Sequence, residues 1–319
     1  MQTLTSDGIV DMAVAEAPDS PSELAANALQ AASAARLPRG GWLRRCKRAA
    51  LPAYYAATGP LRKAMLSWLV ARGRAPIVVV AYHRVADDAA TEWTIATHVF
   101  RRQVAWLKRH FDLVSLQEAQ RRVAAQTNHT PTVSITFDDG YADNCRVALP
   151  LLLRERIAFT YFVTSSAILE GQCFAHDQAL GLRLQPNTLE QVRQLVAEGV
   201  EIGAHTRTHA DLGRLHDPRE LYDEVVSSRD ELQTALGCQI RYFAFPFGQR
   251  ANLSRAAFAL AAQSSYEGVV SAYGGYNFPG DDPFHLQRPC VDGPDLKLKN
   301  AATLDPYKLW TIPRYQYNG

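Results

Sequence analysis

Two parts of the chain carry the side chains that metal-dependent hydrolases use. Asp138 and Asp139 are adjacent carboxylates directly after an apolar stretch, and His205 and His209 stand four positions apart. One carboxylate and two imidazoles form a ligand set that suits Zn²⁺ and leaves a fourth position open for water. The second carboxylate can then take a proton from that water. Either pair alone is a weak signal, and together they indicate hydrolysis at a metal centre.

The elements that must position these residues follow a strand–helix alternation that begins near residue 76. Such a pattern is typical of parallel strands joined by crossover helices. It predicts strands over residues 77–81, 111–114, 132–137, 159–163, 200–204, 242–245 and 268–270. It predicts helices over 99–108, 116–125, 146–155, 189–198, 218–236 and 254–262, and an irregular loop beside the site over 165–187. About seven strand–helix units result, which favours a closed or nearly closed α/β barrel.

The candidate residues all follow the ends of expected strands. His83 follows the first strand, the two carboxylates the third, the two histidines the fifth, and the turn Pro246-Phe247-Gly248 the sixth. Each has a simpler explanation when taken alone, since Asp-Asp-Gly is often a turn and a histidine at a strand end is often only hydrogen-bonded. Parallel barrels keep their catalytic groups where the carboxyl ends of the strands meet. The shared position therefore predicts an enzyme active site.

Residues 76–292 resemble the polysaccharide deacetylase family, which is also called the NodB-homology family or carbohydrate esterase family 4. The resemblance rests on four segments in the family's order: 82–85, 136–141, 201–209 and 243–248. It implies a distorted (β/α)₇ barrel, which agrees with the number of strand–helix units. It also implies removal of N-acetyl groups from sugars.

The same resemblance assigns roles to individual residues. Asp138 would be the general base, and one divalent metal would be held by Asp139, His205 and His209. Zinc is the expected ion, with cobalt or nickel as alternatives. The metal and the backbone N–H of Phe247 would stabilise the oxyanion. Four residues would line the oxyanion site and the substrate cleft: Tyr141, Pro246, Phe247 and Gly248.

The chain departs from the commonest family pattern in two places. Ala244 stands where many members have an arginine that holds the base, and the order of residues around His285 is altered. Both departures resemble the subgroup with a Tyr-His-x-Val first strand, which includes exopolysaccharide N-deacetylases. In that subgroup the general acid is the histidine after the first strand, here His83. His285 remains the alternative acid, Arg288 could replace the missing arginine, and Asp177 is a further candidate for the cleft.

The leading interpretation is a metal-dependent N-deacetylase acting on N-acetylhexosamine units of a glycan or of a lipid-linked sugar. One rival is a deformylase or amidase on a lipid-linked or small substrate, because the same kind of site hydrolyses several amides. A rival of another class is a catalytically silent barrel that binds glycan. The complete set of metal ligands argues against a silent barrel, and Ala244 argues mildly for one.

The N-terminal part differs in composition from the rest. Residues 1–40 are predicted to be a disordered tail, 41–75 a basic-aromatic helical segment, 76–295 the deacetylase domain and 296–319 a C-terminal extension. No acidic residue lies between Glu23 and Asp87, whereas arginines and lysines alternate there with residues such as Trp42 and Trp68. The segment 41–74 could form a helix pair on an anionic membrane, or its helices could pack on the following domain. Both alternatives stay open at this stage.

The overall composition is that of a globular protein. The 319 residues are 47% hydrophobic, enough for a large core, and the net charge of +2 gives no sign of nucleic-acid binding. Five cysteines without a Cys-x-x-Cys pair indicate free thiols in a reducing compartment and exclude an all-cysteine metal site. The sequence lacks a secretory signal pattern and any run of about 18 apolar residues. We therefore expect a cytoplasmic protein, peripheral at most at the inner membrane face.

Overall fold

The structure is a computed structural model that describes residues 41–317, with side chains from residue 50 onward. The chain divides into two units, Met1–Leu43 and Arg44–Gly319, and the second contains the sheet and the helices around it. The tail predicted over residues 1–40 lies outside the described residues. No helix in the described part of the chain is long and apolar enough to cross a membrane.

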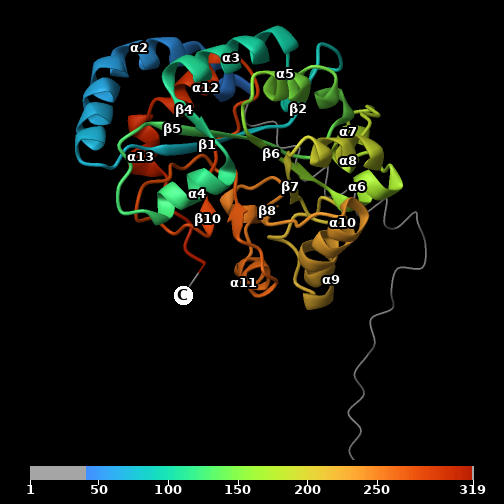
Figure 1. Cartoon of the computed structure of the whole chain (residues 1–319). Helices are drawn as coiled ribbons and strands as arrows, with labels where there is room; N and C mark the ends of the chain where they lie inside the picture. The colour runs from blue at the N-terminus through green and yellow to red at the C-terminus, as the bar shows by residue number, and fades with distance from the viewer. Residues whose placement is uncertain (1–40, 318–319) are drawn as a thin grey trace, which may run out of the picture. The chain divides into compact units, whose positions relative to one another are not determined.

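A parallel sheet forms the centre of the second unit (Figure 1). Among the described residues it has eight strands: β1 (Ile77–Tyr82), β4 (Asp112–Val114), β5 (Thr132–Phe137), β6 (Phe159–Val163), β7 (Glu201–Ala204), β8 (Tyr242–Ala244), β9 (Gly268–Val270) and β10 (His285–Leu286). Their order is β1-β5-β6-β7-β8-β9-β10, with β4 paired beside β5. All pairings are parallel, so the carboxyl ends of the strands share one rim. A separate two-stranded sheet joins β2 (Arg84–Val85) and β3 (Thr94–Ile95).

The two ends of the large sheet, β1 and β10, approach each other without forming a ladder. Ala81 in β1 donates its N–H to the carbonyl of Pro289 at 3.0 Å and accepts the N–H of Val291 at 2.9 Å. An isolated bridge also joins Ala81 to Cys290. The sheet is thus nearly closed into a barrel, which confirms the fold predicted from the strand–helix alternation.

Helices surround the sheet (Figure 1). In the described residues they are α2 (Gly41–Ala71), α3 (Thr97–His110), α4 (Leu116–Ala124), α5 (Ala148–Arg154), α6 (Ser165–Glu170), α7 (Ala175–Gln178), α8 (Leu189–Ala197), α9 (Pro218–Tyr222), α10 (Ser228–Leu236), α11 (Arg255–Gln263), α12 (Asp295–Ala302) and α13 (Pro306–Thr311). Local chemistry sets several boundaries. Thr188 forms a capping box with Gln191 at the start of α8, and Asp217 caps α9 with Pro218 at the first helical position. Gly237 adopts φ +67° and ends α10.

Three predicted elements differ from those observed. The segment 165–187 contains α6 and α7 rather than an irregular loop, since helices of six and four residues are too short to show a helical period. The helix predicted over 218–236 is interrupted by a π-helical turn, Asp223–Ser227. The helix predicted over 146–155 begins only at Ala148. Pro150 therefore lies in the first turn, where its missing N–H removes no helical hydrogen bond.

The basic-aromatic segment is one helix, α2, and not the predicted helix pair. Pro52 and Pro60 lie inside it without ending it. On its inner face, the Tyr54 hydroxyl donates to Asp305 Oδ1 at 2.6 Å, and the buried Arg62 donates to Asn300 Oδ1 at 2.6 Å. These bonds join α2 to α12 and α13, so this face packs on the domain.

Candidate active site

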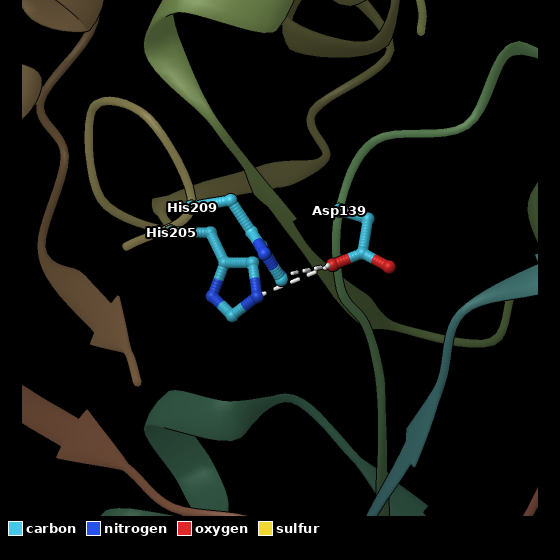
Figure 2. Close-up of side chains that lie close together, drawn as sticks. All are labelled: Asp139, His205 and His209. Atoms are coloured by element: carbon cyan, nitrogen blue, oxygen red, sulfur yellow. Dashed lines mark ion pairs between the residues drawn. The ribbon is translucent and has the colours of Figure 1, made fainter. Parts of the chain in front are cut away.

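The three predicted metal ligands meet at the rim of the barrel (Figure 2). Asp139 follows β5, while His205 follows β7 directly and His209 lies in the next loop. The Nε2 atoms of His205 and His209 lie 3.3 and 3.2 Å from Asp139 Oδ1. Two ligands of a tetrahedral zinc ion with bonds of about 2.0–2.1 Å are about 3.3 Å apart, so the spacing matches a shared ion.

The protonation of these side chains also fits a cation. His205 Nδ1 lies 2.8 Å from the carbonyl oxygen of Ala244 and must carry the ring proton, so Nε2 of the neutral ring presents a lone pair to Asp139. Asp139 Oδ1 is buried and has no hydrogen-bond partner among the described residues. A carboxylate oxygen that faces the Nε2 lone pair of His205 is repelled unless a positive charge lies between the two atoms. A divalent ion satisfies all three atoms.

Backbone strain concentrates at the same rim. Asp139, Thr206, His209 and Phe247 adopt φ values of +73°, +63°, +63° and +59°, a region that side chains other than glycine rarely adopt. Residues held in such conformations cluster at functional sites, because the surrounding structure must enforce them. The strained backbone therefore sets the direction of two predicted metal ligands, Asp139 and His209, and of the Phe247 peptide.

The proposed base, Asp138, is fully enclosed and paired. Arg288 contacts it through two parallel bonds, each 2.8 Å long, to Oδ1 and Oδ2. Arg288 also donates to Thr136 Oγ1 at 2.8 Å and to the Ser271 carbonyl at 3.1 Å. Burial acts to raise the pKa of Asp138, but Arg288, His205 and His83 together outweigh it, with Arg288 first among them, and hold the pKa below its usual value. Many family members hold this carboxylate with an arginine at the position that is Ala244 here. Arg288 lies where it can do the same from another part of the chain.

His83 forms a second charged pair on this rim. Its Nδ1 lies 2.6 Å from Asp292 Oδ2, and its backbone N–H donates to Asp292 Oδ1 at 3.1 Å. Asn144 Nδ2 donates to the His83 carbonyl at 2.7 Å. Burial opposes a positive charge here, but Asp292, with a smaller contribution from Asp139, raises the pKa of His83 well above its usual value. Sequence reasoning missed Asp292, because the strand that precedes it, β10, was not predicted.

His285, the alternative acid, lies elsewhere. It is completely buried, its Nε2 lies 2.8 Å from Ser271 Oγ, and its ring packs against Phe258, Tyr315 and Tyr317. In the described structure it contacts neither Asp138 nor a metal ligand. Burial lowers the pKa of His285 to about 3, so the ring is neutral at physiological pH.

Two of the other cleft candidates, Tyr141 and Asp177, lie together at α7. The buried Tyr141 hydroxyl donates to Asp177 Oδ2 at 2.8 Å and lies 2.9 Å from His176 Nε2. The His176 ring lies 5.1 Å from that of His209, between their centroids. Phe247 is 49% exposed, packs edge-on against His209, and has a backbone N–H without a partner in the described residues. The turn Pro246-Phe247-Gly248 closes with a 2.6 Å bond from the Gly248 N–H to the Pro246 carbonyl.

Comparison with known proteins agrees with this geometry. Residues 125–267 match the family model of polysaccharide deacetylases. The chitooligosaccharide deacetylase of Bradyrhizobium sp. (strain ANU 289) is 31% identical over 132 residues, which are 41% of this chain and 52% of that protein. The chain spans between 7% and 61% of the length of three curated relatives that it matches.

Two solved structures share the barrel. IcaB from Ammonifex degensii superposes with a TM-score of 0.59 at 25% identity, over 72% of this chain and 97% of that one. The Streptococcus pyogenes deacetylase PplD, solved in complex with acetate, superposes with a TM-score of 0.60 over 72% and 99% of the two chains. Its 20% identity shows the fold alone. The family model over residues 125–267, the order of the motifs and the barrel therefore agree in identifying a polysaccharide deacetylase domain in this chain.

Proposed function

We propose that this protein is a metal-dependent hydrolase that removes N-acetyl groups from N-acetylhexosamine units of a glycan or of a lipid-linked sugar. The observation that carries the proposal is the Arg288–Asp138 pair beside the ligand set of Asp139, His205 and His209. It places an ionised base next to a site that fits a divalent cation. The name of one curated relative, the chitooligosaccharide deacetylase of Bradyrhizobium sp., supports the same reaction class.

The residues divide the work of amide hydrolysis among them. A zinc ion held by Asp139 and the two histidines would polarise the amide carbonyl and lower the pKa of water. Asp138 accepts the proton of the attacking water, while Arg288 fixes the orientation of that carboxylate. The Phe247 N–H donates to the oxygen that becomes negative in the transition state. His83 gives a proton to the departing nitrogen, so the products are acetate and a free amine.

His83 is suited to this role because its charge is maintained by Asp292. A bound divalent cation would offset the contribution of Asp139 to the raised pKa, but not the direct contact with Asp292. The imidazolium is therefore present below that raised pKa and is lost as the pH increases through it. The resemblance of residues 82–85 to the Tyr-His-x-Val subgroup supports the same assignment.

The function is tested by incubating the zinc-loaded protein with N-acetylhexosamine oligomers and measuring acetate and free amine together. Equal amounts of both products are expected. N-formylated and simple N-acylated compounds in the same assay test for a deformylase or amidase. Stoichiometric metal with no product from any substrate would indicate a glycan-binding barrel instead.

The replacement His83→Ala is expected to lower kcat/KM on N-acetylated sugars by about 10²–10⁴-fold. Hydrolysis of an activated aryl acetate ester should fall far less, because an aryloxide leaves without a proton. The comparison variant, His285→Ala, should show little difference between the two substrates. Amide-selective loss in His285→Ala alone would transfer the acid role to His285. Equal losses on both substrates in His83→Ala would make His83 a positioning residue.

We further propose that the protein is cytoplasmic and that an exposed face rests on an anionic membrane. Leu61 and Trp68 of α2 are 45% and 53% exposed, and Tyr307 and Trp310 of α13 are 64% and 76% exposed. The Tyr307 N–H lies 3.3 Å from the Tyr54 hydroxyl, so the two helices are neighbours. No acidic residue occurs over 24–86, and the Arg72 guanidinium lies 4.1 Å from the Trp68 ring centre. Aromatic side chains among cations suit an anionic lipid surface.

The variant Trp68→Ser/Trp310→Ser is expected to bind vesicles containing phosphatidylglycerol at least about fivefold more weakly than the unaltered protein, by co-sedimentation. Binding should also weaken with added salt. Tyr222→Ser is the matched control, since Tyr222 is 49% exposed on a different helix, α9. Unchanged binding by the double variant, or equal binding to neutral phosphatidylcholine vesicles, would contradict the proposal.

A further inference from the structure

A histidine that the mechanism does not use lies beside the metal ligands. His176 is on α7, and its ring centroid is 5.1 Å from that of His209. The ring stacks on Phe174 at 5.4 Å and meets the edge of Trp93 at 5.0 Å. Its side chain remains 23% exposed. His176 is therefore fixed by packing on two sides and still reachable from solvent.

Its hydrogen bonds fix the position of the ring proton. The Tyr141 hydroxyl has a single proton and two close neighbours, Asp177 Oδ2 at 2.8 Å and His176 Nε2 at 2.9 Å. Burial raises the pKa of Asp177 to about 6, so at neutral pH it is a carboxylate and takes the tyrosine proton. The bond between His176 and Tyr141 then requires His176 Nε2–H to donate to the tyrosine oxygen.

The other ring nitrogen, Nδ1, is consequently a hydrogen-bond acceptor in the neutral ring. It has no partner among the described residues. The exposed part of the side chain thus presents a lone pair next to the metal ligands, between the apolar surfaces of Trp93 and Phe174.

We propose that His176 is a specificity-determining residue whose Nδ1 accepts a hydrogen bond from a hydroxyl group of the bound N-acetylated sugar. The inference rests on the proposed function and adds the feature of the substrate that this side chain recognises. A lone pair selects a donor and repels an anion, and flanking aromatic rings pack well against the C–H groups of a sugar. Tyr141 and Asp177 are positioning residues, since they hold the tautomer without touching the substrate.

Two substitutions of His176 separate the lone pair from the shape of the ring. His176→Phe keeps a planar ring but has no acceptor, whereas His176→Asn keeps an acceptor atom attached to Cγ. On N-acetylhexosamine oligomers we expect kcat/KM to fall by about 5- to 100-fold in His176→Phe and clearly less in His176→Asn. On an aryl acetate that lacks hydroxyl groups, the loss in His176→Phe should be far smaller. His216→Phe, at an exposed position, is the matched control.

The tautomer can be observed without any substrate. Long-range ¹⁵N–¹H NMR spectra should show His176 as a neutral ring protonated at Nε2, and Tyr141→Phe should abolish this preference. A ring protonated at Nδ1 in the unaltered protein would overturn the inference. So would equal kcat/KM for His176→Phe and the unaltered protein on the sugar, or equal losses on sugar and aryl ester. Inactivity of the unaltered protein on every acetylated sugar would instead overturn the proposed function, and with it this role of His176.

Discussion

The replacement Asp138→Asn is expected to reduce turnover of N-acetylated sugars by about 10²–10⁴-fold while the metal content stays unchanged. The amide has nearly the same shape as the carboxylate but cannot accept the proton of the attacking water. It also leaves the buried Arg288 without its counter-charge. Removing one partner of a buried ion pair typically costs about 3–5 kcal/mol of stability. Turnover, metal content and the free energy of unfolding should therefore be measured on the same preparation.

A second variant separates the loss of the base from the loss of stability. The double variant Asp138→Asn/Arg288→Met removes both charges of the pair. Compared with Asp138→Asn alone, it should recover part of the free energy of unfolding without recovering turnover. Recovery of both would mean that Asp138→Asn fails for structural reasons. A parallel loss of metal and rate in Asp138→Asn would instead make Asp138 a metal ligand.

Loss of a metal ligand should have an even larger effect. Replacing a residue that only hydrogen-bonds to a metal ligand typically lowers metal affinity by about 10–100-fold. In His205→Ala or His209→Ala a ligand itself is lost, so we expect the affinity for zinc to fall by more than that. Deacetylation should then drop below detection, because two ligands cannot hold the ion in place. Metal content after dialysis and the affinity in competition with a chelator give the measurement.

His83→Ala is the matched control for metal binding, since His83 lies on the same rim without belonging to the ligand set. It should retain one zinc ion per chain. Removing the metal from the unaltered protein should lower its melting temperature, because an ion that binds only the folded state stabilises it. Adding zinc, cobalt or nickel back then ranks the three metals by activity. Full zinc retention by both ligand variants would refute the ligand assignment.

The sequence by itself determined the barrel and the location of the proposed metal ligands. Asp138, Asp139 and His205 each follow a short apolar stretch, and a strand of this kind is encoded by a few neighbouring residues. Parallel strands bring their carboxyl ends to one rim whatever the details of packing, so polar residues after several strands must gather there. Local patterns were therefore sufficient to predict these positions.

Only the tertiary structure decided which charged groups pair. Arg288 and Asp138 are 150 positions apart, and His83 and Asp292 are 209 apart. Nothing local specifies such partners, because they depend on the near closure of the sheet between β10 and β1. Arg288 and His285 are three positions apart in an extended segment, and the side chains of such residues point to opposite sides. Arg288 reaches Asp138, while His285 is buried among aromatic rings.

The segment around His176 and the face of α2 and α13 also depended on tertiary packing. The four residues of α7 carry no periodic pattern, and its position over Tyr141 is set by contacts with a distant part of the chain. Likewise, α13, the helix that carries Trp310, lies beside α2 through contacts such as the Tyr54–Asp305 hydrogen bond, whose partners are 251 positions apart. A short element has too few residues to encode where it packs, so the rest of the fold decides its position.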